Sequence, residues 1–219
     1  MIYNENNLIS QIYNIGIIPV TTLINPAQDA IDLCAALRRG GVNIIEVTFR
    51  AEGAQKAIYD IKNKFPDMLV GAGTVVSEEQ VRAAQGSGAD FAVSPGFSRA
   101  VVECCKKMGI DIFPGCTTAT DYQAAIEYGL DVLKFFPAEQ SGGIDRIQAL
   151  SGPFPYIKVI PTGGISLENI ESYMLCKNVL ACGGSYMVSQ KLIGEKRWDK
   201  ITEFCTMTTD KIKEIRNHG

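Results

Sequence analysis

Residues 43–74, NIIEVTFRAEGAQKAIYDIKNKFPDMLVGAGT, show the pattern that decides the fold. Two short apolar runs, at the beginning and at the end of this stretch, are typical of buried strands. An apolar stripe with helical spacing lies between them and consists of Ala54, Ala57, Ile58 and Ile61. The stretch therefore predicts a strand, a covering helix and a second strand parallel to the first.

The same alternation continues along the chain. Apolar runs that resemble strands begin near Ile17, Asn43, Met68, Asp90, Ile110, Asp131, Tyr156 and Asn178. They follow one another at roughly 20 to 26 residues, with helical patterns between them. Eight such units predict an α/β fold, a (β/α)8 TIM barrel. Six units would have favoured an open doubly wound sheet, and no G-x-G-x-x-G motif follows the first strand.

The barrel is expected to occupy residues 1–219 as a single domain, because α/β barrels of about 200 to 250 residues commonly form one domain. No linker or low-complexity tract divides the chain. Residues 3–15 are expected to form an extra N-terminal helix, and residues 198–215 to contain the last outer helix.

Capping signals predict several helix ends. Helix starts are expected at Asn25 with Pro26, and at the S/T-x-x-Q capping boxes Ser77 to Gln80 and Thr120 to Gln123. Helix ends are expected at Gly40, Gly88, Gly109 and Gly129, each of which stands just before a predicted strand.

Charge and cysteine content restrict the partners and the compartment. The 21 Lys and Arg residues against 24 Asp and Glu residues give a net charge of −3, so no basic excess is available for nucleic acid. No apolar run approaches the 18 or so residues of a membrane span, and the first cationic residue is Arg38. The seven cysteines include no C-x-x-C motif. We therefore expect a cytoplasmic protein with reduced thiols and with neither nucleic-acid nor membrane partners.

The single histidine, His218, is the next to last residue. A Ser-His-Asp or Cys-His triad and a His-rich metal centre are therefore disfavoured. Any chemistry is expected to use Lys, Glu, Asp, Tyr, Cys or backbone groups, with no metal ligands.

Two predicted strands carry a charged residue within an apolar run, Glu46 and Lys134. Active sites of TIM barrels lie at the carboxyl ends of the strands. Because strand side chains alternate, Glu46 shares one face with Thr48 and Arg50, and the opposite, more apolar face should pack on the helices. Alternation leaves the direction of Lys134 open. The second and sixth strands lie across the barrel axis from each other, so Glu46 and Lys134 can point at one central volume.

Two interpretations of this pair remain open. In one, it is a structural ion pair or a snorkelling lysine. In the other, burial disfavours the charged lysine, the free amine of Lys134 attacks a ketone to form a Schiff base, and Glu46 moves the protons. The lack of an interior histidine favours the second interpretation.

Glycine-rich segments follow the seventh and eighth predicted strands. TIM barrels often bind phosphate at these two loops through backbone N–H groups. A single Gly-Gly is weak evidence because turns also need glycine, but two at adjacent strand ends predict a phosphate site. The candidate ligands are Thr162, Gly163, Gly164 and Ser166 on one loop, and Gly183, Gly184 and Ser185 on the other.

Seven segments in order carry a resemblance to a known family. They are EVTFR (46–50), GAGT (71–74), SPG (94–96), FPG (113–115), KFFPA (134–138), PTGGIS (161–166) and GGS (183–185). The sequence from about Ile17 to Ser185 resembles the 2-keto-3-deoxy-6-phosphogluconate (KDPG) aldolases, a family that includes the 4-hydroxy-2-oxoglutarate (KHG) aldolases.

The resemblance implies a class I aldolase, a metal-free lyase that cleaves KDPG into pyruvate and glyceraldehyde 3-phosphate, and in some members KHG into pyruvate and glyoxylate. It implies that Lys134 forms the Schiff base, without any cofactor, and that Glu46 is the general acid and base. Arg50 and Thr74 would hold the pyruvate carboxylate, and Pro95 and Phe135 would line the pyruvyl pocket. The implied phosphate ligands are Thr162, Gly163, Gly164, Gly184 and Ser185. The family likeness also implies a homotrimer.

Alternatives remain open on sequence grounds. Phe49 and the pair Cys116-Thr117 depart from the usual motifs, which leaves substrate preference undecided between KDPG, its galactonate epimer and unphosphorylated KHG. A phosphosugar isomerase or epimerase would also explain the phosphate loops, although it usually needs a histidine or a bound metal. A non-catalytic sensor of a phosphorylated ligand is the third alternative.

Overall fold

The computed structural model describes residues 7–23 and 26–218. The described residues contain the eight predicted strands: β1 (Ile17–Thr21), β2 (Ile44–Thr48), β3 (Leu69–Gly73), β4 (Phe91–Val93), β5 (Asp111–Phe113), β6 (Val132–Phe135), β7 (Lys158–Pro161) and β8 (Cys182–Gly184). Helices follow them in alternation: α2 (Pro26–Arg39), α3 (Ala54–Lys64), α4 (Glu78–Gly86), α5 (Arg99–Met108), α6 (Ala119–Glu127), α7 (Gly143–Ser151), α8 (Ile170–Met174), α9 (Gln190–Gly194) and α10 (Trp198–His218). Short 3-10 helices occur at η1 (Glu139–Ser141) and η2 (Tyr186–Val188).

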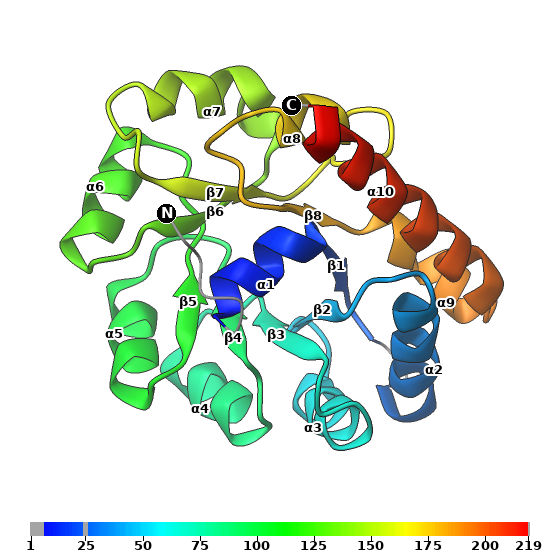
Figure 1. Ribbon diagram of the computed structural model, residues 1–219. Helices are drawn as coiled ribbons and strands as arrows, with labels where there is room; N and C mark the ends of the chain where they lie inside the picture. The colour runs from blue at the N-terminus through cyan, green and yellow to red at the C-terminus, as the bar shows by residue number, and fades with distance from the viewer. Residues whose placement is uncertain (1–6, 24–25, 219) are drawn as a thin grey trace.

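The strands form a closed parallel ring. Six of them pair in the order β5-β4-β3-β2-β1-β8, and β6 pairs with β7. Isolated parallel bridges connect β5 to β6 at Gly115 and Lys134, and β7 to β8 at Thr162 and Gly183. Figure 1 shows the helices arranged as an outer ring around these strands. The predicted TIM barrel is confirmed.

Burial on both faces explains why the strands are so apolar. Every residue of β1 and β2 is buried, since helices cover the outside of the ring and side chains fill its inside. Residues on one face of a strand therefore pack against the helices, and residues on the other face pack inside the ring. A charged side chain inside the ring must find its partner there.

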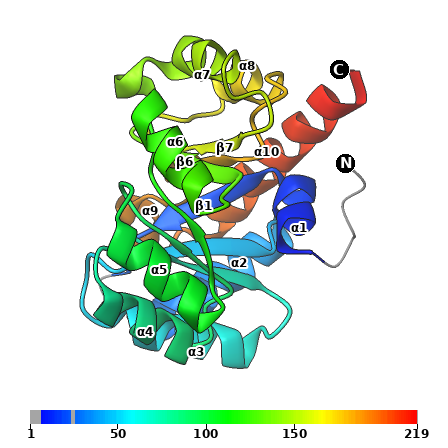
Figure 2. The same cartoon turned by 90° about the vertical axis from the view of Figure 1, so that its left-hand side faces the viewer.

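The extra helix before the barrel is α1 (Leu8–Ile15). Residues 3–6 of the predicted helix lie outside the described residues. Asn7 caps α1 by accepting a hydrogen bond from the Ile9 amide at 3.0 Å. Gly16, with φ 79°, turns the chain directly into β1, so α1 lies at the amino end of the barrel, as Figure 2 shows from the side.

The helices end within two residues of the predicted glycines, Gly40, Gly88, Gly109 and Gly129, and one predicted helix start needs correction. Ser77 caps α4, while the predicted cap at Asn25 lies outside the described residues. The box predicted at Thr120 to Gln123 is wrong, because α6 is capped two residues earlier by Thr118, whose hydroxyl accepts a hydrogen bond from the Asp121 amide. Asp121 accepts from the amides of Thr117 and Thr118, which a glutamine at position 123 is too far along the helix to reach.

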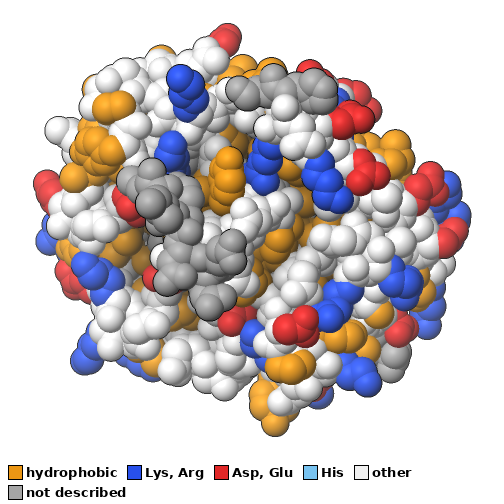
Figure 3. Space-filling view, in the orientation of Figure 1, with side chains coloured by type: hydrophobic (Ala, Val, Ile, Leu, Met, Phe, Trp, Pro, Cys, Tyr) orange, Lys and Arg blue, Asp and Glu red, His pale blue; other side chains and the backbone are white. Residues whose placement is uncertain are grey.

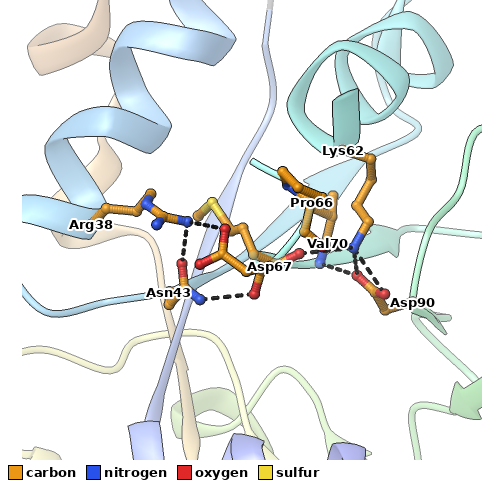
Figure 4. A network of polar contacts seen from close by, with 8 residues as sticks. Arg38, Asn43, Lys62, Pro66, Asp67, Val70 and Asp90 are labelled. Atoms are coloured by element: carbon orange, nitrogen blue, oxygen red, sulfur yellow. Dashed lines mark hydrogen bonds and ion pairs between the residues drawn. The ribbon is translucent and has the colours of Figure 1, made fainter. Parts of the chain in front are cut away.

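The amino ends of β2, β3 and β4 are joined by polar contacts (Figure 4). The Lys62 ammonium from α3 donates to both carboxylate oxygens of Asp90, at 3.0 and 2.9 Å, and Asp90 also accepts from the Val70 amide at 2.7 Å. On the neighbouring side, Arg38 of α2 donates to Asn43 and to Asp67. The Arg38 guanidinium holds the pKa of Asp67 below its usual range. These contacts stabilise the end of the barrel opposite the strands' carboxyl ends.

The surface at this amino end mixes both signs of charge. Figure 3 shows Lys and Arg side chains interspersed with Asp and Glu side chains on this face. Among the described residues, no helix combines the length and the apolar character needed to cross a bilayer.

Candidate active site

A buried ion pair lies inside the ring. The Lys134 Nζ of β6 donates to Glu46 Oε1 of β2 at 3.3 Å, and both side chains are more than nine-tenths buried. The prediction that these two side chains meet in one central volume is confirmed. The pair comes together across 88 residues of sequence, because the second and sixth strands face each other across the barrel axis.

The backbone of β6 places Lys134 at a strand junction. Its amide donates to the Pro114 carbonyl at 3.0 Å, and its carbonyl accepts from the Cys116 amide at 2.8 Å. Lys134 is therefore held by backbone hydrogen bonds on the β5 side, where the bridge to Gly115 closes the ring. A rigid strand in this position directs the amine without a loop rearrangement.

Glycine makes room for Glu46. A Cβ atom at Gly73, the last residue of β3, would lie 2.2 Å from Glu46 Oε1. The GAGT motif thus supplies space for the carboxylate as well as a strand end. No sequence pattern indicates this purpose of Gly73, because the contact is made between neighbouring strands.

The pair faces a small apolar cavity. The cavity is lined by Ile18, Glu46, Val93, Phe113, Lys134, Ile160 and Thr162. Apolar walls strengthen electrostatic interactions within the cavity and leave the lysine amine close to a single proton acceptor.

An aromatic ring beside the lysine amine belongs to Phe136. Phe135 is fully buried, does not line this cavity, and lies on the face of β6 opposite to Lys134. Phe136 instead places its ring centroid 5.0 Å from Lys134 Nζ and is partly exposed. The role of Phe135 at the pyruvyl pocket stays a prediction, and Phe136 is a further aromatic candidate because its ring lies beside Lys134. Strand alternation, which puts residues 132, 134 and 136 on one face, is the signal that identifies it.

Arg50 lies nearer the surface than Glu46, as predicted. Its Nε donates to the Thr48 hydroxyl at 3.3 Å, and the residue is exposed. Among the described residues, Arg50 takes part in no ion pair. Its two terminal nitrogens can therefore donate side by side to a carboxylate.

Two further predicted residues stand at the neighbouring strand ends. Thr74, which follows β3, has φ 56°, a left-handed conformation that costs a non-glycine residue about 1 to 3 kcal/mol. Such strain is often found at functional sites. Pro95, after β4, is exposed, and its carbonyl oxygen would lie 2.1 Å from a Cβ atom at Gly115, so the loops after β4 and β5 pack directly against each other.

The loop after β7 has the backbone expected of an anion site. Gly163 and Gly164 both adopt left-handed conformations, with φ 101° and 82°. The Glu139 amide of η1 donates to the Gly163 carbonyl, and the Glu139 side chain packs against Gly164 while it accepts from the Tyr173 hydroxyl. Gly164 is exposed, so an anion can approach its backbone.

The loop after β8 lies directly beside it. Gly183 bridges to Thr162, and a Cβ atom at Gly183 would lie 2.2 Å from Thr162 Oγ1. Gly184 is buried and Ser185 is exposed at the strand end. The Thr162 side chain, however, lines the cavity of the ion pair, whereas the loop residues lie outside it. Ser166, also considered at this site, donates its amide to Asn169 Oδ1 within its own loop.

The nearest thiol is not arranged as a nucleophile. Cys116 follows β5, and burial raises the pKa of its thiol to about 12. Its Sγ points to the Asp121 carbonyl at 3.8 Å. Within residues 7–23 and 26–218, no group of three or more His, Cys, Asp or Glu side chains is placed to hold a metal ion.

Comparison with known proteins gives a family match over most of the chain. The family model described as KDPG and KHG aldolase matches residues 8–204. A 2-dehydro-3-deoxy-phosphogluconate aldolase of Haemophilus influenzae is 41% identical over 213 residues, which cover 97% of this chain and 100% of that protein.

Two solved structures are similar throughout. The KDPG aldolase of Legionella pneumophila, solved with pyruvate captured as a covalent carbinolamine intermediate, has a TM-score of 0.88 and 37% identity, covering 92% of this chain and 98% of that chain. The Zymomonas mobilis aldolase with 3-phosphoglycerate has a TM-score of 0.86 and 32% identity, covering 92% and 95% of the two chains.

Proposed function

Because the chain belongs to the KDPG and KHG aldolase family, we propose that it cleaves KDPG into pyruvate and glyceraldehyde 3-phosphate through a Schiff base on Lys134. The protein is an aldolase, an enzyme of the lyase class. The observation that carries the assignment of roles is the contact of 3.3 Å between Lys134 Nζ and Glu46 Oε1 inside the barrel. Lys134 can act as a nucleophile, and Glu46 is the other ionisable side chain that lines the same cavity. This arrangement suits the attack of an amine on a carbonyl group with proton transfer by a carboxylate.

The first step joins the lysine to the substrate. Glu46 takes a proton from the Lys134 ammonium, the resulting free amine attacks the C2 ketone to form a carbinolamine, and Glu46 returns that proton to the departing hydroxyl, which leaves as water to give a protonated imine. Glu46 moves the protons that this step requires, because its carboxylate already accepts a hydrogen bond from the amine. The substrate C2 carbonyl must then enter between the ion pair and the Phe136 ring.

The second step breaks the bond between C3 and C4. Glu46 takes the proton of the C4 hydroxyl, the C4 oxygen becomes the aldehyde, and the electron pair of the broken bond moves to the imine nitrogen. The product on the enzyme is a neutral enamine. Glu46 then returns the proton to C3, and water hydrolyses the imine to release pyruvate and restore the amine of Lys134.

The remaining residues position the two ends of the substrate. Arg50 and Thr74 stand at the ends of β2 and β3 and would hold the C1 carboxylate. Pro95, Phe135 and Phe136 are the candidates that would limit the pyruvyl pocket. The distal phosphate would bind the backbone at the ends of β7 and β8, where Gly164 and Ser185 are exposed and the candidates are Gly163, Gly164, Gly184 and Ser185 together with the backbone of Thr162. Remote phosphate binding aligns the reacting carbon atoms.

A second substrate is supported by the family match, which includes KHG aldolases. KHG keeps the 2-keto acid that Lys134 and Arg50 recognise but lacks the distal phosphate. We expect cleavage to pyruvate and glyoxylate with a lower kcat/KM than for KDPG, since KHG lacks the phosphate that these loops are proposed to bind.

The assembly and the metal independence are also proposals. The resemblance to the family supports a metal-free cytoplasmic enzyme that assembles as a homotrimer. Light scattering should then report about three times the 23.8 kDa mass of the chain, and chelation of divalent metals should leave activity unchanged.

Borohydride trapping tests the proposed chemistry. Reduction in the presence of pyruvate should add one stable pyruvyl group at Lys134, located by mass spectrometry of peptides. Lys134→Met should abolish both the adduct and turnover while circular dichroism remains that of a folded barrel. Glu46→Gln should reduce kcat by about 10² to 10⁴, because proton transfer loses its carrier.

A matched control uses another lysine of the barrel. Lys158 begins β7, and its ammonium donates to the Lys177 carbonyl at 2.7 Å. Lys158→Met should retain the adduct and the activity. Unmodified wild-type protein after borohydride and pyruvate, or full turnover by Lys134→Met, would refute the proposal.

A further inference from the structure

Two threonine hydroxyls connect Arg50 to the barrel wall through hydrogen bonds. Arg50 Nε donates to Thr48 Oγ1 at 3.3 Å, and Thr48 Oγ1 lies 2.8 Å from Thr22 Oγ1. Thr48 is the last residue of β2 and is 1% exposed, and Thr22 directly follows β1. The three side chains form a continuous chain of hydrogen bonds from the barrel wall to the guanidinium.

The donor and the acceptor are fixed at the Arg50 end of these hydrogen bonds. Arg50 Nε carries a hydrogen and can only donate, so Thr48 Oγ1 must accept there. Either hydroxyl of the Thr48–Thr22 pair can donate to the other, and in both arrangements Thr48 Oγ1 keeps a lone pair for Arg50. Without Thr22, the buried Thr48 hydroxyl is left to rotate in search of another partner.

A residue from the neighbouring β8 side of the barrel holds the backbone of Thr22. Gln190, the first residue of α9, donates through Nε2 to the Thr22 carbonyl at 2.5 Å. Gln190 lies five residues after Ser185, at the end of the loop that we assign to phosphate. The backbone that presents the Thr22 hydroxyl is therefore anchored to the β8 side of the barrel, where β1 and β8 pair.

We propose that Thr22 is a positioning residue for pyruvate binding: through Thr48 it orients the Arg50 guanidinium toward the substrate carboxylate. The inference rests on the proposed function and extends it to a residue that makes no contact with the reacting atoms. The Arg50 side chain is exposed and long, so orientation by a fixed acceptor reduces the freedom that it loses on binding the carboxylate.

In the proposed reaction, Arg50 binds the substrate carboxylate both in the ground state and in the transition state. This determines whether the loss of Thr22 changes KM or kcat. A defect in a contact made equally in the ground state and the transition state raises KM and leaves kcat unchanged. Thr22→Val should therefore raise the pyruvate concentration that half-saturates borohydride trapping by about threefold to tenfold, as expected for one weakened hydrogen bond to a charged group. The rate of trapping at saturating pyruvate should stay within twofold of wild type.

The preceding residue is a matched control. Thr21 has the same side chain, and its Oγ1 is buried without a hydrogen-bond partner among the described residues. Thr21→Val should leave half-saturation unchanged. Thr22→Ser keeps the hydroxyl and should restore the wild-type value. Thr22→Ala provides a second loss of the hydroxyl, and thermal unfolding of each variant confirms that the barrel is intact.

A double-mutant cycle tests the route through Arg50. Lysine has no equivalent of the Arg Nε hydrogen, so Arg50→Lys should weaken pyruvate binding and also remove the contact to Thr48. Adding Thr22→Val to Arg50→Lys should then produce no further change. An equal effect of Thr22→Val in both backgrounds would overturn the inference.

The outcomes separate the two proposals. If wild type forms the Lys134 adduct and Thr22→Val matches Thr21→Val in half-saturation, the role of Thr22 is overturned and the aldolase function stands. If wild type forms no adduct with pyruvate, the proposed function fails, and the role of Thr22 fails with it. A rise in half-saturation for Thr22→Val and Thr22→Ala, reversed in Thr22→Ser, supports the inference.

Discussion

Glu46 can approach Lys134 only because position 73 has no Cβ atom. At this scale, the site depends on whether a single methyl group fits between neighbouring strands. Gly73 is not required for a left-handed turn, so its purpose is steric. The buried ion pair thus depends on three residues on three strands, of which only two are charged.

Gly73→Ala tests this dependence. The added methyl group would lie 2.2 Å from Glu46 Oε1 and must displace the carboxylate. Because a displacement of about 1 Å at a catalytic group can cost 10²-fold, we expect kcat for KDPG cleavage to fall by about that factor. Steady-state kinetics measures the loss, and circular dichroism verifies the fold.

Gly86→Ala is the control for that substitution. Gly86 ends α4, and a Cβ atom there meets nothing within 4 Å. Its kcat should remain within twofold of wild type, and its stability should stay the same or rise slightly, since alanine has less freedom in the unfolded chain. Equal activity of Gly73→Ala and Gly86→Ala would show that Glu46 tolerates the methyl group.

Single helices show how far local patterns predict structure. The capping box of α6 involves Thr118 and Asp121, although Thr120 and Gln123 have the same spacing. Both pairs satisfy the motif, and the choice depends on where the chain leaves β5 and on the Cys116 amide, which bonds to Lys134. The path of the preceding loop therefore selects the helix start.

Substitution of the two threonines distinguishes the caps. Thr118→Ala should lower the free energy of unfolding by about 1 kcal/mol, because the Asp121 amide loses its acceptor. Thr120→Ala, at an exposed position within the helix, should be neutral or slightly stabilising. Urea denaturation followed by circular dichroism measures both, and a larger loss for Thr120→Ala would place the cap where the sequence motif alone suggested.

At the scale of the whole molecule, packing of the helices against the ring buries most of the cysteine thiols. Burial raises the pKa of Cys105, Cys116 and Cys205 to about 12, and it also raises the pKa of Cys34 and Cys182. Cys176 is partly exposed and lines a groove at the amino end of the barrel. The closed ring and its helices thus leave one cysteine more accessible than the others.

Thiol labelling at pH 8 tests this difference. Only the thiolate reacts, and a thiol with a pKa near 12 is ionised to about one part in ten thousand at that pH. We expect a maleimide reagent to modify Cys176 first in the native protein, and all seven cysteines in urea. Aldolase activity should survive the modification of Cys176, which lies at the end opposite the strands' carboxyl ends. Rapid native labelling of Cys105 or Cys116 would contradict the packing described.

The sequence by itself determined the elements and the chemistry of the centre. Strand and helix periods depend on residues a few positions apart, which is why the eight strands and most helix ends could be predicted. Glu46 and Lys134 could be paired because each is a charge within an apolar strand, and a barrel of eight strands places the second opposite the sixth.

Only the tertiary structure decided the contacts between strands. The space provided by Gly73 and the hydrogen bonds that connect Thr22 through Thr48 to Arg50 both depend on which residues lie beside each other in the closed ring. Thr22 and Thr48 are 26 residues apart, and their spacing carries no local signal. The physical reason is that the stagger between strands is set by the packing of the entire barrel, whereas a local pattern records only the preferences of its own segment.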